Sequence, residues 1–240
     1  ELQKKRSGGG GRPRPEASGD VQYTLSDYDE DGNPQQLNIY NYGKDGQLQS
    51  IVSYDMKGMD ISMWKGKCKE LGSKDGEKFL GSFEKANMEG LTEDKILEKV
   101  IYTGEKGKEK IDYVLSGYGE DGNPTTISVY EYNKNGDSND NLDEVITYDI
   151  EGLGIDFTKP KSEWIGLLTE DRISRTSVYA GEKGKEKLSY ILDDYSVGDD
   201  GANKPGTMSV YDYNNNPEQD KDNEALDEVR TYDISDYYGT

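Results

Sequence analysis

The sequence predicts an all-β protein of three tandem antiparallel β-meander repeats, about four strands each, joined by short helical connectors. Three observations lead to this prediction. Long segments recur along the chain, their apolar and polar residues alternate with a period of two, and Gly, Asn, Asp and Pro separate the alternating runs. Such alternation is typical of strands that bury one face.

The first repeat spans residues 21–58 and lacks an opening strand. The positions that align with that strand are GGGRPR (9–14), a run of glycine and proline that cannot form one. A connector follows over residues 59–91. Apolar residues at helical spacing within GEKFLGSFEKANMEG predict one short helix there.

The second repeat spans residues 92–150 and contains the full set of strands. Its predicted strands are 97–104, 110–115, 125–133 and 142–150. A connector at 151–168 leads to the third repeat, residues 169–240, so that the three repeats together supply eleven strands. Asp-Gly pairs between the second and third strands of each repeat predict tight hairpins, because such turns require positive φ angles.

Alternation within the second repeat predicts which side chains share a face. Ile111, Tyr113 and Leu115 fall on one face of their strand. In the next strand Tyr130 and Tyr132 fall on one face, and Ile127 and Val129 fall on the other. Only 31% of the chain is apolar, but 19 residues are Tyr. We therefore expect rows of half-buried tyrosines that pack across neighbouring strands. We expect Trp64 and Trp164 to pack against the sheet and so to hold the connectors on it.

The chain begins with a basic segment, predicted to be a flexible Gly/Pro-rich arm over residues 1–20. Its first 14 residues contain five basic side chains and one acidic residue, Glu1, so their net charge is +4. The net charge of the whole chain is −20. These basic residues are Lys4, Lys5, Arg6, Arg12 and Arg14. An acidic remainder attracts such an arm electrostatically.

Tyr-x-Tyr, Gly, Leu and Tyr-Asp recur in the strands NIYNYGKDGQLQSIVSYDMKG (38–58), VYEYN…LDEVITYDIEG and VYDYN…LDEVRTYDIS. This pattern resembles the Tyr-Asp (YD, or Rhs-type) repeats of bacterial and animal surface proteins and toxin shells. The resemblance implies β-hairpins laid edge to edge in an extracellular or secreted protein without catalytic activity of its own. It covers the last two strands of each repeat.

One acidic loop matches the first half of an EF-hand calcium loop. Asp27, Asp29 and Asp31 precede Gly32 at the spacing of the first ligands, but the bidentate Glu at the twelfth position is missing. Two interpretations stay open here, calcium ligands and solvated turn residues. Calcium is the one cofactor that the sequence leaves open.

The composition excludes several classes of function. Without histidine the chain has no Ser-His-Asp or Cys-His catalytic arrangement, and its one cysteine excludes an internal disulfide. A charge of −20 argues against binding to nucleic acid, and no apolar run is long enough for a membrane-spanning helix. The repeated GEKGKEK segment lacks a phosphate-binding frame and is interpreted as a hairpin turn. We expect no enzymatic activity.

These features predict an extracellular or cell-surface protein that polymerises head to tail through open sheet edges. The expected assembly residues are those of the arm together with Val21, Tyr23 and Leu25 at one edge and Val229, Tyr232 and Ile234 at the other. Its main partner is thus a second copy of itself. Two alternatives remain, a surface adhesin that binds glycan or calcium, and a shell segment of a secreted toxin.

Overall fold

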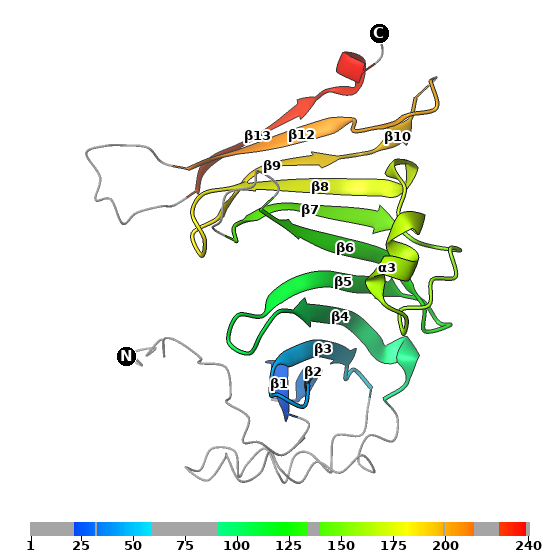
Figure 1. The fold of residues 1–240 in the computed structure, drawn as a ribbon, viewed down its shortest axis with the longest axis vertical. Coiled ribbons are helices and arrows are strands. Elements are labelled where there is room, and N and C mark those ends of the chain that lie inside the picture. Colours follow the sequence, from blue (N-terminus) through cyan, green and yellow to red (C-terminus); the bar gives the residue numbers. More distant parts are fainter. Residues whose placement is uncertain are drawn as a thin grey trace, which may run out of the picture.

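The computed structural model confirms the all-β fold and describes residues 22–31, 33–58, 91–133, 140–198, 200–213 and 226–238. Eleven strands form one sheet in the order β1-β2-β3-β4-β5-β6-β7-β8-β9-β12-β13, and every neighbouring pair is antiparallel. The strands lie across the long axis of the molecule, from β1 at one end to β13 at the other (Figure 1).

Each repeat contributes a consecutive block of strands to this sheet. The first contributes β1 (Gln22–Tyr28), β2 (Pro34–Tyr42) and β3 (Leu48–Asp55). The second contributes β4 (Ile96–Thr103), β5 (Lys110–Tyr118), β6 (Pro124–Tyr132) and β7 (Leu142–Asp149). The third contributes β8 (Ile173–Ala180), β9 (Lys187–Asp193), β12 (Thr207–Tyr213) and β13 (Leu226–Asp233).

The predicted strands of the second repeat agree with β4 to β7 to within a few residues, and the eleven predicted strands are those of the sheet. The sequence did not predict a small separate ladder of β10 (Ser196–Val197) and β11 (Asn203–Lys204), which extends the hairpin between β9 and β12. This ladder contains only two residue pairs. Strands this short cannot show an alternation of apolar and polar residues in the sequence.

Helical segments in the described residues are short. The connector between the second and third repeats holds α3 (Lys161–Trp164) and the 3₁₀ turn η4 (Ile165–Leu167). Further 3₁₀ turns are η3 (Glu93–Lys95), η5 (Glu170–Arg172) and η6 (Ser235–Tyr238). The arm at 1–20, the helix predicted in the first connector, and Trp64 lie outside the described residues.

The same backbone irregularities recur at equivalent positions of the three repeats. Asp27, Gly117 and Asp194 stand two residues after equivalent leucines and have φ angles of 52°, 67° and 56°. Only residues that tolerate the left-handed region are suited to this position, which accounts for the alternation of Asp and Gly. The ladder register also shifts just before Tyr42, Tyr132 and Tyr213.

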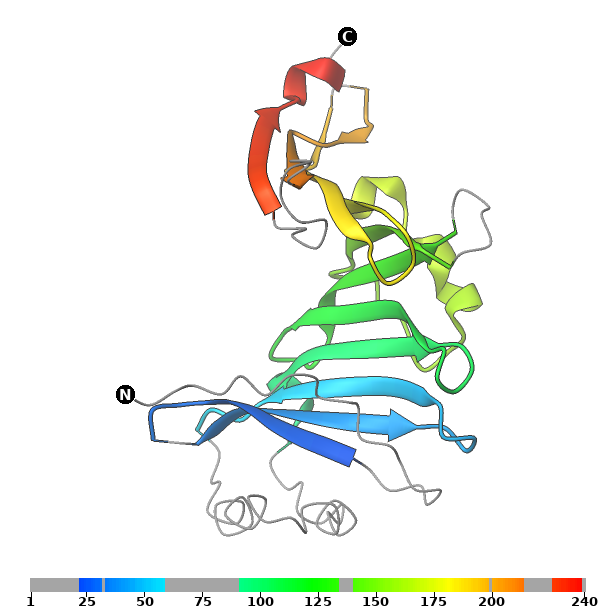
Figure 2. The same ribbon diagram turned by 90° about the vertical axis from the view of Figure 1, so that its left-hand side faces the viewer.

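One face of the sheet carries the main apolar cluster. Tyr113, Leu115, Ile127 and Val129 are buried there against Trp164 from α3. The indole ring meets the Tyr113 ring edge-on at 5.1 Å between centroids, so the predicted role of Trp164 is confirmed. Figure 2 shows the α3 connector on one side of the strands.

A second apolar cluster lies on the same face of the first repeat. Its buried members are Tyr23, Leu37, Ile39 and Met56. Ladder pairs Tyr23–Ile39 and Ile39–Val52 run from this cluster across the strands toward the second repeat. The core is therefore a strip along one face of the sheet.

One predicted member of the apolar row is misplaced. Tyr113 lies opposite Ile101, but the register then shifts and Ile111 lies opposite Tyr102. The shift leaves Asp112 as an extra residue, so that Ile111 leaves the face of Tyr113 and Leu115. The prediction that all three share one face was wrong because a bulge interrupts the strict alternation.

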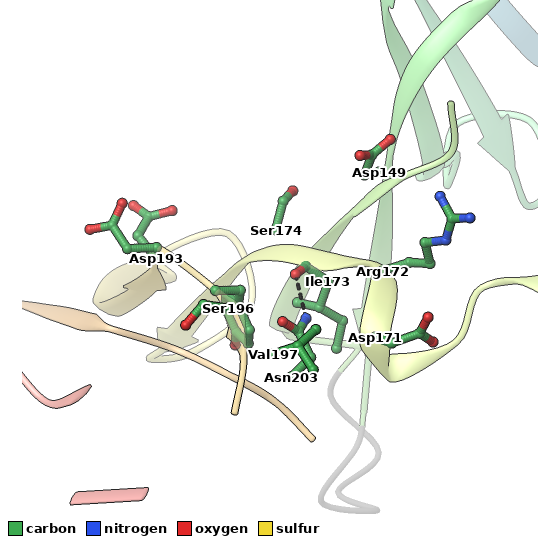
Figure 3. A pocket seen from close by; sticks show the side chains of 11 residues that line it. Asp149, Asp171, Arg172, Ile173, Ser174, Asp193, Ser196, Val197 and Asn203 are labelled. Atoms are coloured by element: carbon green, nitrogen blue, oxygen red, sulfur yellow. Dashed lines mark hydrogen bonds between the residues drawn. The ribbon is translucent and has the colours of Figure 1, made fainter. Parts of the chain in front are cut away.

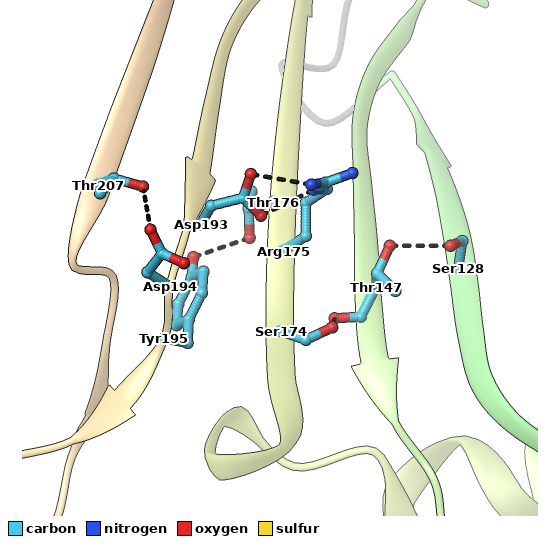
Figure 4. Close-up of polar contacts among 9 residues, drawn as sticks. All are labelled: Ser128, Thr147, Ser174, Arg175, Thr176, Asp193, Asp194, Tyr195 and Thr207. Carbon is cyan, nitrogen blue, oxygen red and sulfur yellow. Dashed lines mark hydrogen bonds and ion pairs between the residues drawn. The ribbon is translucent and has the colours of Figure 1, made fainter. Parts of the chain in front are cut away.

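The other face is lined by hydroxyl pairs and tyrosines. Cross-strand hydroxyl contacts join Ser116 to Thr126 at 2.7 Å. Ser128 and Thr147 make the same kind of contact at 2.8 Å (Figure 4). Tyr130 and Tyr132 lie on this face and are half-buried, as predicted. Burial raises the pKa of the Tyr132 hydroxyl to about 12. These tyrosines therefore pack within the sheet.

Candidate functional site: the edges of the sheet

β13 is the last strand of the sheet and has no outer partner among the described residues. Its inner side pairs with β12 from Thr207–Asp233 to Tyr213–Leu226. Leu226, Val229 and Tyr232 of this strand keep 49%, 44% and 43% of their surface exposed. Exposed apolar groups beside free backbone N–H and C=O groups are the features that allow another strand to pair.

A charged group occupies the middle of the β13 edge. The Arg230 guanidinium lies 2.7 Å from the Glu228 carboxylate and 3.3 Å from that of Asp212 on β12. The hydrogen bond with Glu228 raises the pKa of Arg230 and lowers that of Glu228. Both side chains are about half exposed, so they remain accessible to a partner.

β13 copies the sequence of an interior strand almost completely. LDEVRTYDI at 226–234 matches LDEVITYDI at 142–150 except that Arg230 replaces Ile146. The outer side of β7 pairs with β8 from Glu144–Val178 to Tyr148–Ile173. β7 thus has a neighbouring strand on its outer side, whereas the equivalent strand β13 has none among the described residues. β13 also carries a charged residue, Arg230, where β7 has Ile146.

The opposite edge, β1, exposes Tyr28 at 54%, but the residues of this strand that were expected to take part in assembly are less accessible. Tyr23 is buried and Leu25 packs against the same cluster, so their side chains belong to the core and not to a free surface. Val21 and the five basic residues of the arm lie outside the described residues. Ile234 is likewise buried, and its N–H donates to the carbonyl oxygen of Gly206. Val229 and Tyr232 are thus the predicted edge residues that the structure describes as exposed.

The repeated GEKGKEK loops link one repeat to the next. Glu109 accepts hydrogen bonds from the N–H groups of Leu48 and Gly107, and Glu186 accepts them from Leu142 and Gly184. Leu48 and Leu142 are the first residues of β3 and β7. The loops therefore hold the start of the preceding strand, a structural role that the sequence did not show.

The acidic loop of the first repeat is organised as a turn. The Asp29 carboxylate accepts hydrogen bonds from the Asn33 backbone and side chain at 2.7 and 3.0 Å and from Gln35 at 3.1 Å. Asp27 has the left-handed conformation described above. Within the described residues no group of three or more His, Cys, Asp or Glu could hold a metal ion. Calcium at Asp27, Asp29 and Asp31 stays a prediction.

An open polar pocket of about 610 Å³ lies where the β10–β11 ladder meets the ends of β7, β8 and β9. Asp149, Asp171, Arg172 and Asn203 are among its lining residues (Figure 3). Asn203 anchors the ladder, because its side-chain amide donates to the carbonyl oxygens of Glu170 and Ile173 at 3.0 and 2.8 Å. Nothing in the sequence pointed to this pocket.

Several carboxylates around the pocket already have partners. Asp193 forms a bidentate pair with Arg175 at 2.7 and 3.0 Å, and Asp194 accepts a hydrogen bond from the Thr207 hydroxyl (Figure 4). Asp149 accepts one from the Glu151 N–H. These contacts stabilise the strand ends.

The chain was compared with known families, curated proteins and solved structures. No described protein family and no curated protein matches it. Among solved structures, a porin-like protein from Bacteroides uniformis has a TM-score of 0.21 and 8% identity over 89% of this chain and 95% of that chain. A protein of unknown function from Bacteroides fragilis has a TM-score of 0.14 and 13% identity over 89% and 94%. These likenesses are too weak to assign a fold or a function.

No helix in the described part of the chain has the length and apolar character that crossing a membrane requires.

Proposed function

We propose that the protein is a non-enzymatic extracellular structural protein that assembles with copies of itself into a filament, sheath or surface layer. The observation that carries the proposal is the pair of open edges, β1 and β13, on a sheet whose described residues include no other partner for them. β13 also exposes Leu226, Val229 and Tyr232. An edge of this kind is a template for strand addition.

The charge distribution adds a second contribution to assembly. The first 14 residues carry +4, so the remainder of the chain carries −24. An arm of one copy is therefore attracted to the body of another, and added salt weakens that attraction. The extracellular location rests on the resemblance to Tyr-Asp repeats, whose hairpins are also laid edge to edge.

Strand direction limits how a head-to-tail polymer can form. Because eleven strands alternate in direction, the first and last strands run the same way. Simple translation of a second copy along the sheet brings its β1 beside β13 in parallel. Turning the copy over makes the contact antiparallel, but it places the apolar face of one sheet next to the polar face of the other.

The test of this function is assembly of the purified chain at rising concentration, followed by size-exclusion chromatography and negative-stain microscopy. We expect oligomers or extended particles that dissociate on dilution. A monodisperse monomer at high concentration overturns the proposal. Deletion of residues 1–20 tests whether the arm contributes to assembly. If assembly is unaffected both by this deletion and by about 0.5 M salt, electrostatic attraction between the arm and the body plays no part in it.

The polar pocket supports a second candidate function, carbohydrate binding by a surface adhesin. Asp171, Arg172 and Asn203 offer acceptors and donors around an open hollow, the arrangement that hydroxyl groups of a sugar require. A glycan array followed by NMR titration tests this candidate. Binding that is lost in Asp171→Asn and retained in the matched surface variant Asp236→Asn supports it, and an array without any bound glycan rejects it.

A further inference from the structure

We propose that one of the assembly contacts is a two-fold pairing of β13 with β13 of a second copy, centred on Val229. Because a two-fold contact closes on itself, an extended assembly also needs a second contact at the β1 edge. This inference rests on the proposed function, and it names which edge meets which. A rotation by half a turn about the sheet normal places two β13 strands side by side in antiparallel orientation. The same rotation keeps the apolar faces of both sheets on one side, which a turned-over β13–β1 contact does not.

Charge selects the register of this pairing. With Val229 opposite its own copy, Glu228 of each chain lies directly opposite Arg230 of the other. Both residues lie on one face of β13, because they are two positions apart. The contact therefore gains two cross-strand ion pairs, each of the kind that stabilises antiparallel sheets. A register centred one residue further along would place the two Arg230 side chains against each other.

The exposed apolar residues fit the same register. Val229, which is 44% exposed, meets its own copy at the two-fold axis. Leu226 and Tyr232, also exposed, stand at equal sequence separation from Val229 on its two sides, with the register shift of the β12–β13 ladder between Leu226 and Glu228. The two-fold operation therefore brings the Leu226 end of one strand to the Tyr232 end of the other. All three exposed apolar side chains of β13 thus lie within the paired segment.

The replacement of Ile146 by Arg230 has two competing explanations. An edge charge often prevents pairing with other chains, and in that case β13 is a protected edge. Glu228 is shared with the interior strand, where Glu144 stands, so Arg230 is the residue that is new at this edge. The Glu-Val-Arg order at 228–230 is self-complementary under two-fold pairing, which favours a contact between copies. A ladder this short buries little surface, so we expect a weak dimer that forms reversibly.

Cysteine cross-linking tests the register. In a Cys68→Ser background, Val229→Cys places two thiols opposite each other, and we expect a disulfide-linked dimer on mild oxidation. Thr231→Cys is the matched control on the same strand and face. Its two thiols would be about 13 Å apart in this register, too far to join. Equal cross-linking of both variants, or of neither, overturns the register.

Charge swapping tests the contact itself. Arg230→Glu alone places like charges opposite each other, and so does Glu228→Arg alone, so each variant should raise the dissociation constant at least about tenfold. An equimolar mixture of the two variants restores opposite charges across the interface and should form a mixed dimer. Both variants lack the internal Glu228–Arg230 pair, so only a contact between chains explains recovery on mixing.

The outcomes separate this inference from the function on which it rests. If the wild-type chain stays monomeric at every concentration, the proposed function fails as well. If it assembles but Val229→Cys does not cross-link and the mixture does not recover, assembly uses another contact and the two-fold pairing is wrong.

Discussion

The carboxylate of Glu109 accepts a hydrogen bond at 3.1 Å from the backbone N–H of Leu48, a residue 61 positions earlier in the chain. Glu186 makes the same contact to Leu142, 44 positions earlier. Each contact joins the loop after the first strand of one repeat to the start of the last strand of the preceding repeat. The sheet is thus held between repeats by a repeated side-chain contact as well as by its ladder.

We predict that Glu186→Ala lowers the free energy of unfolding by about 1 kcal/mol, because two backbone donors lose their acceptor. Hydrogen exchange should increase at Leu142 and at Gly184. Glu182→Ala, in the same exposed loop, is the matched control and should change neither stability nor exchange. Equal effects of the two substitutions would show that general loop charge, not this contact, is responsible.

We predict that Trp164→Ala destabilises the protein by about 3–5 kcal/mol, since it removes a buried indole from the apolar cluster. Trp164 is only 3% exposed and also packs against Phe157, with 5.2 Å between the two ring centroids. Urea unfolding followed by circular dichroism measures the loss. Tyr237→Ala, at a position 84% exposed, should leave the midpoint unchanged. An unchanged urea midpoint for Trp164→Ala would mean that packing of the connector against the apolar cluster does not stabilise the fold.

We predict that stability falls between about pH 10 and pH 12. Burial, with a smaller contribution from Asp112, raises the pKa of Tyr113 from 10.0 to about 12. The folded state therefore holds this proton more tightly than the unfolded chain, and its stabilisation, present below pH 10, is lost as pH rises through the folded pKa. Absorbance at alkaline pH, with urea-unfolded protein as the reference, follows tyrosine ionisation. Coincident titrations of folded and unfolded protein would contradict the prediction.

We predict that Asp27→Gly leaves stability nearly unchanged, because Gly117 already occupies the equivalent left-handed position of the second repeat. Asp27→Val should be clearly destabilising, by about 1–2 kcal/mol, since a β-branched residue is strained there. Thermal unfolding with and without calcium measures both effects. A calcium-dependent stabilisation that is lost in Asp27→Gly would instead establish the predicted calcium site.

The sequence was sufficient to predict the strands because each repeat shows the same alternation around the same turns. Tyr113, Leu115, Ile127 and Val129 were recognisable as face residues in this way. Ile111 was not, because the extra residue Asp112 shifts the register without any signal in the apolar pattern. The β10–β11 ladder is too short to alternate at all.

The candidate site was predictable in part. Val229 and Tyr232 were predicted as assembly residues of the last strand, and the structure describes both as exposed, while their role in assembly stays a prediction. Tyr23 and Ile234 were predicted as assembly residues at the first and the last strand, but both side chains are buried. Proximity to a sheet edge does not decide which way a side chain points. The shared direction of β1 and β13 depends on the complete antiparallel strand order, which sequence alone leaves undetermined.

Sedimentation velocity of the 240-residue chain over a wide range of concentrations tests the central claim most directly. Assembly through the sheet edges predicts a weight-average mass that rises above 26.9 kDa with concentration and falls back on dilution. A mass that stays at 26.9 kDa at every concentration would contradict the claim that the edges join copies of this protein.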